Sequence, residues 1–134
     1  MKMTQLRKAV TWTLQIVLAM IFLTVGMAKI SGVQTSVEVF NRIGVGQWLR
    51  YLTGSVEVLA SVLMLFGPYA SIGAGLVAVT MIGAIMAHLW LIGGNVVPAL
   101  ALGIASGVVL YLRREIRRSE EVRVIHPEAP RKSA

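Results

Sequence analysis

Apolar residues gather into four long runs along the chain, at residues 9–29, 51–66, 70–92 and 96–112. A helix that crosses a bilayer needs about 20 such residues, so each run suits one span, although the second is slightly short. Turn-forming residues, Gly67-Pro68 and Gly93-Gly94-Asn95, separate the last three runs. The pattern predicts an all-α polytopic membrane protein, in which residues 1–112 form one antiparallel bundle of four transmembrane helices.

The connection between the first two runs is long enough to hold structure of its own. Apolar residues recur there at helical spacing, namely Val33, Val37, Phe40 and Ile43. Polar residues fill the positions between them, which is typical of a helix that lies at a membrane interface or over the mouth of a bundle. We therefore expect a short amphipathic helix over residues 31–43, ended by Gly44-Val45-Gly46.

Composition agrees with a chain whose solvent is largely lipid. Of the 134 residues, 56% are hydrophobic and 14% are charged, against about 45–50% and 25% in soluble domains. The chain has no cysteine, which excludes disulfides, thiol redox chemistry and thiolate metal sites. We also expect no metal site elsewhere, because one histidine and one carboxylate make a poor ligand set.

Basic residues set the expected orientation. Three of the 13 Lys and Arg residues precede the first run, and seven follow the last one. By the positive-inside rule, both termini should lie in the cytoplasm, and residues 113–134 should form a basic cytoplasmic tail. The first run is longer than the ~7–15-residue core of a signal peptide, so we expect it to remain as a span.

A pI near 10.6 raises nucleic-acid binding as an alternative role for the basic residues. Because these residues lie beside helix ends, membrane topology already explains them, and we expect no nucleic-acid partner. A basic cluster at such a position can contact anionic lipid, and plain anchoring of the helix end is the simpler alternative. The cluster comprises Arg113, Arg114, Arg117 and Arg118.

The second run contains a single carboxylate, Glu57. A charge at the centre of a bilayer costs roughly 2.5–3.5 kcal/mol on insertion scales, so Glu57 needs a compensating partner. The helix face that it shares is small or polar, and consists of Arg50, Thr53, Gly54, Ala60 and Ser61. Small residues mark helix–helix contacts in membranes, so we expect Glu57 to face protein rather than lipid.

The other three runs carry comparable faces. In the first run the face consists of Trp12, Gln15, Ala19, Phe22, Gly26 and Lys29. In the third it consists of Gly73, Thr80, Ala84, Ala87 and His88, and in the fourth of Ala99, Gly103, Ser106 and Gly107. From these faces we expect helix packing at Gly26, Gly54, Ala60, Ser61, Ala84, Gly103 and Gly107.

Depth in the membrane suggests which polar residues meet. At about 1.5 Å per residue, Glu57 lies roughly 9 Å inside the outer end of its span. Lys29 ends the first span on the same side, His88 lies near the outer end of the third, and Arg50 and Asn95 lie close above. We expect these five residues to converge in the outer half of the bundle. Two interpretations stay open: a polar clamp that fixes helix register, or a site that binds a head group or relays a proton.

Four short motifs occur in order over residues 10–112. They are Gly26-Met27-Ala28-Lys29, Phe40-Asn41-Arg42-Ile43-Gly44, Gly54-Ser55-Val56-Glu57 and Gly83-Ala84-Ile85-Met86-Ala87-His88. In this order and spacing they resemble the DoxX/DoxX-like family of small bacterial membrane proteins. The resemblance implies a four-helix protein of the bacterial inner membrane.

The resemblance also implies a role beside redox enzymes. We expect a non-catalytic subunit or anchor of a membrane redox complex, in which Lys29, Glu57 and His88 hold a quinone or a lipid head group. Catalysis by this chain is less expected, since no complete catalytic constellation is evident. Two alternatives stay open. One is an assembly factor or structural partner in a larger complex, and the other is a small transporter, which would have to oligomerise. Lipid, and either a protein partner or a second copy of the chain, are the expected partners.

Overall fold

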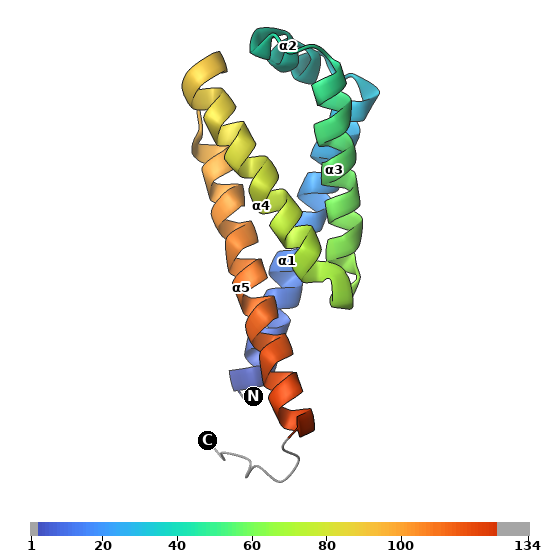
Figure 1. Cartoon of the computed structure of the whole chain (residues 1–134), viewed down its shortest axis with the longest axis vertical. Coiled ribbons are helices and arrows are strands. Elements are labelled where there is room, and N and C mark those ends of the chain that lie inside the picture. Colours follow the sequence, from blue (N-terminus) through green and yellow to red (C-terminus); the bar gives the residue numbers. More distant parts are fainter. Residues whose placement is uncertain (1–2, 126–134) are drawn as a thin grey trace.

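The computed structural model describes residues 3–125, and they form four long helices joined by short helical segments (Figure 1). In chain order these elements are α1 (Met3–Ser31), α2 (Gln34–Ile43), α3 (Trp48–Leu65), η1 (Gly67–Tyr69), α4 (Ala70–Ala87), η2 (His88–Ile92) and α5 (Val97–Ile125). No strand occurs within the described residues. The predicted all-α bundle, with a short helix in its first connection, is confirmed.

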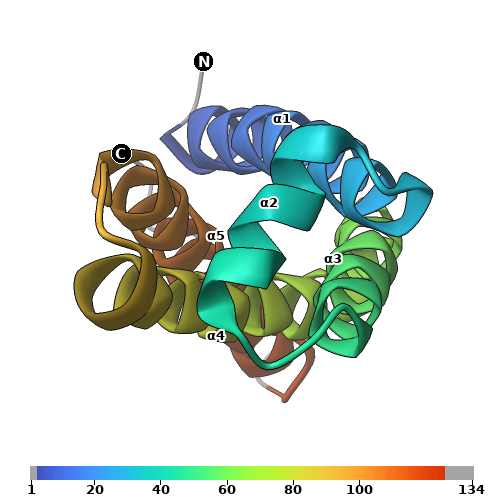
Figure 2. The same cartoon turned by 90° about the horizontal axis from the view of Figure 1, so that it is seen from above.

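The long helices run antiparallel, with α1 packed beside α3 and α4 packed beside α5 (Figure 1). The first turn of α1 and the last turns of α5 lie at one end of the bundle, which we call the terminal end. Helix α2 lies across the opposite end, the α2 end (Figure 2). Helices α3 and α4 are close near the terminal end and diverge toward the α2 end, so the two helix pairs spread beneath α2.

Glycines allow the closest approach between helices. A Cβ atom on Gly73 of α4 would lie 2.5 Å from the carbonyl oxygen of Ala60 on α3, so only glycine fits this crossing. Around the crossing lies one continuous apolar core. Its buried members are Leu18, Ala19, Phe22, Ala60, Met64, Ala74, Val77, Met81, Ala99 and Val109.

All four long helical segments have the length and hydropathy to cross a membrane, and their bounds are Gln5–Ser31, Trp48–Leu65, Gly67–Ile92 and Val97–Ile125. Large apolar side chains cover their outer surface. Val79 and Ile104, for example, are 68% and 61% exposed. Such a surface is unfavourable in water and suits lipid. Together, these features indicate a multi-pass membrane protein.

Helix α5 continues well beyond the apolar run that ends at Leu112. The expected tail therefore begins as a helix, which extends to Ile125, while residues 126–134 lie outside the described part of the chain. Arginine and glutamate favour helices, and Tyr111 Oη donates a hydrogen bond of 2.8 Å to Glu115 one turn later. Apolar periodicity shows where a span ends, but not where its helix ends.

Candidate functional site

The candidate site lies where α1 and α3 approach each other at the α2 end. A Cβ atom on Gly26 would lie 2.9 Å from the carbonyl oxygen of Gly54, and one on Gly54 would lie 3.0 Å from that of Gly26. Two facing glycines thus bring the backbones together. Lys29 lies one turn from Gly26 toward the α2 end, beside Gly54, and Glu57 lies one turn from Gly54 in the opposite direction, beside Gly26, so the two side chains reach toward each other along this contact.

Lys29 and Glu57 form a buried ion pair. Lys29 Nζ lies 2.5 Å from Glu57 Oε1, the Glu57 side chain is fully buried, and that of Lys29 is 18% exposed. The second carboxylate oxygen, Oε2, is buried and has no hydrogen-bond partner within residues 3–125. The pair therefore neutralises the charge that the sequence placed in the second span, but leaves one acceptor unused.

Arg50 holds the end of α1 rather than the carboxylate. Its Nη1 donates to the backbone carbonyl of Lys29, and its guanidinium lies 4.3 Å from the ring centre of Tyr51. Helix α1 ends there because Gly32 adopts a left-handed conformation, with φ of 73°. A cation at the carboxyl end of a helix is favourable, so Arg50 completes the cap of α1.

Gln47 connects Arg50 to helix α2. Its Oε1 accepts a 2.6 Å hydrogen bond from Arg50 Nε. Its Nε2 donates to the Val37 carbonyl at 3.1 Å and to Asn41 Oδ1 at 2.8 Å. The ion pair, the cap of α1 and the amphipathic helix are therefore linked by one chain of polar contacts.

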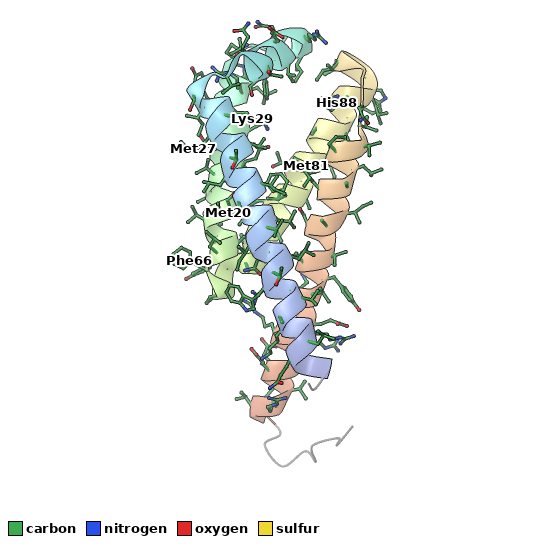
Figure 3. All side chains as sticks on the ribbon, turned by 180° about the vertical axis from the view of Figure 1, so that it is seen from behind. Met20, Met27, Lys29, Phe66, Met81 and His88 are labelled. Atoms are coloured by element: carbon green, nitrogen blue, oxygen red, sulfur yellow. The ribbon has the colours of Figure 1, made fainter. Side chains whose placement is uncertain are left out.

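His88 and Asn95 do not join this cluster. His88 Nδ1 lies 3.2 Å from the carbonyl oxygen of Gly93, within its own connection, and Asn95 Oδ1 accepts from the Val97 N–H at 2.9 Å. Figure 3 shows Lys29 and His88 apart, one on α1 and the other at the start of η2, directly after α4. The expected convergence of five residues was wrong for these two, because α4 diverges from α1 and α3 toward the α2 end.

The residues expected at helix contacts occupy different environments. Ala60 and Ser61 are fully buried on α3, and Ser61 Oγ donates to the Glu57 carbonyl at 2.7 Å. Ala84 packs against the edge of the core. A Cβ atom on Gly103 would lie 3.3 Å from Met81, whereas one on Gly107 would meet nothing within 4 Å.

A second polar cluster, not anticipated from the sequence, lies at the terminal end. Gln15 is fully buried; its Nε2 donates to the Met64 carbonyl, and its Oε1 accepts a 2.6 Å hydrogen bond from Arg113 Nε. The Arg113 guanidinium also lies 4.5 Å from the ring centre of Trp12. Signals existed for this contact, because Gln15 is on the polar face of the first run and Arg113 directly follows the fourth.

The four arginines of the basic cluster separate into two pairs. Arg113 bonds to Gln15, and Arg117 Nη2 donates to the Pro68 carbonyl at 2.8 Å. Arg114 and Arg118 are exposed and have no hydrogen bond or ion pair with any described residue. Spacing on one helix explains the division, because residues four apart share a face.

Neither cluster resembles a metal centre. Within residues 3–125, no three His, Asp or Glu side chains lie close enough together to hold a metal ion. What the Lys29–Glu57 pair offers is one partly exposed ammonium donor and one unused, buried carboxylate acceptor. Such a set can hydrogen-bond a small group that carries both an acceptor and a hydroxyl.

Comparison with known proteins agrees with the motifs. The DoxX family pattern matches residues 11–90, more than half of the chain. A protein of Bacillus subtilis (strain 168) named "Putative oxidoreductase CatD" is 32% identical over 76 residues, which cover 57% of this chain and 57% of that protein. No solved structure matches the chain. The chain belongs to the DoxX family.

Proposed function

We propose that this DoxX protein is a non-catalytic membrane subunit or anchor of a redox complex, and that its Lys29–Glu57 pair binds the head group of a quinone. The observation that carries the proposal is Glu57 Oε2, a buried oxygen without a hydrogen-bond donor. Buried polar atoms are nearly always satisfied. The name of the Bacillus subtilis relative, an oxidoreductase, supports the redox context.

The donor set fits a quinone head group. Lys29 Nζ would donate to a carbonyl oxygen of the quinone, and Glu57 Oε2 would accept a hydrogen bond from a hydroxyl of the reduced form. A quinone supplies electron and proton exchange within the bilayer. The chain's own residues orient the ring and hold a proton at the Glu57 carboxylate. A head group would reach the site past the Lys29 side chain, which is 18% exposed.

The role of anchor follows from the position of the site. Arg50 and Gln47 link the ion pair to α2, which lies across the end of the bundle. A partner enzyme docked at the α2 end would therefore contact the element that borders the site. With both termini in the cytoplasm of a bacterial inner membrane, as the basic residues favour, this partner would lie on the periplasmic side. Reporter fusions at either terminus test that orientation.

The test is the amount of quinone that remains with the protein after purification from native membranes. Solvent extracts of the wild type, Glu57→Gln and the matched control Glu38→Gln are compared per mole of protein. Glu38 is an acidic residue on α2 that bonds only to the nearby Gln34. We expect Glu57→Gln to retain at least tenfold less quinone than either of the other two, with a lower melting temperature because Lys29 loses its counter-charge.

Two results would overturn the proposal. One is a wild type that retains no quinone beyond what its lipid carries, and the other is a Glu57→Gln variant that retains as much as the wild type. If Glu57→Gln fails to fold, Lys29→Arg decides, because it keeps the charge but changes the donor geometry. Loss of quinone from a stable Lys29→Arg variant supports a binding site, and retention supports a structural clamp.

A further inference from the structure

A cavity of about 280 Å³ opens at the terminal end, toward the other end of the bundle from the Lys29–Glu57 pair. It lies between α1, η1, the first turn of α4, and α5. Its polar and aromatic lining consists of Lys8, Trp12, Ser71, Arg113, Arg117 and Glu120. The volume is at the lower edge of the roughly 300–1,000 Å³ of small-molecule sites, which suits a head group better than a whole lipid.

The charges that line the cavity do not cancel. Glu120 is already engaged by Lys8, whose Nζ lies 2.9 Å from Glu120 Oε1. Arg113 donates to the side-chain amide of Gln15, and Arg117 donates to the Pro68 carbonyl; both acceptors are neutral. Within residues 3–125, neither arginine is in an ion pair. Lys8, Arg113 and Arg117 thus contribute three positive charges against the one negative charge of Glu120, so the lining carries two positive charges in excess.

Arg113 also has an unused donor. Its Nη2 is buried and has no hydrogen-bond partner among the described residues. The side chain cannot easily turn away, since Gln15 holds Nε at 2.6 Å and the Trp12 ring lies beneath the guanidinium. A fixed guanidinium with free N–H groups is suited to a planar or tetrahedral oxyanion, which it can bind through two parallel hydrogen bonds.

We propose that this cavity binds the phosphate group of an anionic phospholipid head group. Trp12 is partly exposed and lies in the terminal-end part of the first span. Aromatic rings near the end of a span commonly mark the membrane–water interface, which is also the level of lipid phosphates. A net negative head group neutralises the excess positive charge of Arg113 and Arg117, whereas a zwitterionic one adds its own cation. The Ser71 hydroxyl, also in the lining, offers a further donor.

The proposal differs from general attraction of a basic helix to an anionic membrane. That attraction depends on charge near the surface and would involve all four arginines about equally. A built site depends on Arg113 and Arg117, which line the cavity, and not on Arg114 and Arg118, which do not. The same helix thus provides a matched control for each variant.

The experiment measures binding of phosphatidylglycerol to the full chain in nanodiscs of phosphatidylcholine. We expect Arg117→Gln to weaken the affinity about tenfold and Arg118→Gln less than twofold. Arg113→Gln and Arg114→Gln form the second pair, with the same expected order. Because Arg113 also braces Gln15, its variant is interpreted only if its melting temperature is unchanged. Arg117→Gln is the decisive variant.

One further addition, inorganic phosphate, identifies the source of the phosphate. If inorganic phosphate at millimolar concentration displaces phosphatidylglycerol, the site recognises the anion itself, and a soluble phosphate compound is its source. If it does not, the acyl chains contribute, and lipid is the source. Equal losses in all four arginine variants, or no loss in Arg117→Gln, would overturn the proposal in favour of plain surface attraction.

Discussion

The two ends of the bundle differ in how they compensate the charge of a cation beside or on α1. At the α2 end, Lys29 meets a carboxylate, Glu57, and the charges cancel inside the protein. At the terminal end, Arg113 meets a neutral amide, Gln15, and its charge is left over. The two clusters therefore suit different ligands. A neutralised pair with one unused acceptor can hydrogen-bond a neutral head group, as proposed above for a quinone, while cations bonded only to neutral groups favour an anion.

The ends also differ in how much water reaches their ion pairs. The Glu57 side chain is fully buried, whereas the side chains of Lys8 and Glu120 are 47% and 57% exposed. Breaking a buried pair leaves an uncompensated charge in a medium of low dielectric constant. Breaking an exposed pair exchanges one partner for water. The same substitution should therefore have very different effects at the two ends.

The largest effect is expected for Lys29→Met. It leaves Glu57 buried without its cation, which should lower the free energy of unfolding by about 3–5 kcal/mol. Lys8→Met is the matched control and should cost less than about 1 kcal/mol, because its pair is exposed. Reversible unfolding in mixed SDS micelles measures both.

A double variant, Lys29→Met with Glu57→Leu, sharpens this result. Removing both charges should recover most of the lost free energy of unfolding, since Met and Leu fill the space with apolar side chains and leave no charge buried. If Lys29→Met and Lys8→Met are equally mild, the Lys29–Glu57 pair is hydrated, and the contrast between the two ends is wrong.

A smaller effect is expected from Gly26→Val, which tests whether close approach of α1 and α3 creates the buried pair. The added Cβ would lie 2.9 Å from the Gly54 carbonyl oxygen, and the helices must separate, at a cost of about 2–3 kcal/mol. Gly107→Val is the control, because nothing lies within 4 Å of a Cβ there. The same unfolding assay applies. Similar decreases in the free energy of unfolding of the two variants would mean that the helix propensity of valine, not the packing of α1 against α3, causes the destabilisation.

The terminal end has its own structural test in Gln15→Leu. The change removes the acceptor of Arg113 Nε and the donor to the Met64 carbonyl, leaving both unsatisfied, at a cost of about 1–3 kcal/mol. Thr11→Val is the control: Thr11 is equally buried but bonds only to the Arg7 carbonyl of its own helix, 2.8 Å away. A loss in Thr11→Val as large as in Gln15→Leu would contradict a cross-helix brace.

Much of this architecture could be predicted because lipid imposes simple rules. The lengths of the apolar runs predicted the four spans. The small-residue face of the second run predicted that Glu57 points toward a neighbouring helix. Lys29 and Glu57 meet because their helices are consecutive, antiparallel neighbours, and the long side chains bridge the offset in depth between Lys29, beside Gly54, and Glu57, beside Gly26. His88 follows α4, which is also a consecutive, antiparallel neighbour of α3 but diverges from it toward the α2 end, where His88 lies. Depth along a helix can be counted from the sequence, but the tilt that separates α4 from α3 depends on packing of the whole bundle.

The Gln15–Arg113 contact was missed for a related reason. Each residue had a complete explanation alone: Gln15 as part of a packing face, and Arg113 as part of a basic tail. Their pairing depends on α5 continuing as a helix past Leu112, so that the Arg113 side chain reaches back to the face of α1. Helix length beyond the bilayer is set by polar residues, which hydrophobic periodicity does not describe.

The smallest effect on stability is expected for Glu120→Gln, and it connects the two halves of the comparison. Loss of the exposed pair with Lys8 should lower the free energy of unfolding by about 0.2–1 kcal/mol in low salt. The loss should largely vanish near 1 M salt, where the screening length is about 3 Å. Glu121→Gln, with no ion pair among the described residues, is the control.

Because Glu120 lines the cavity, its neutralisation also frees Lys8 there, so affinity for phosphatidylglycerol should rise roughly twofold. A variant that loses both stability and affinity would mean that Glu120 shapes the cavity, and that its charge does not oppose the lipid.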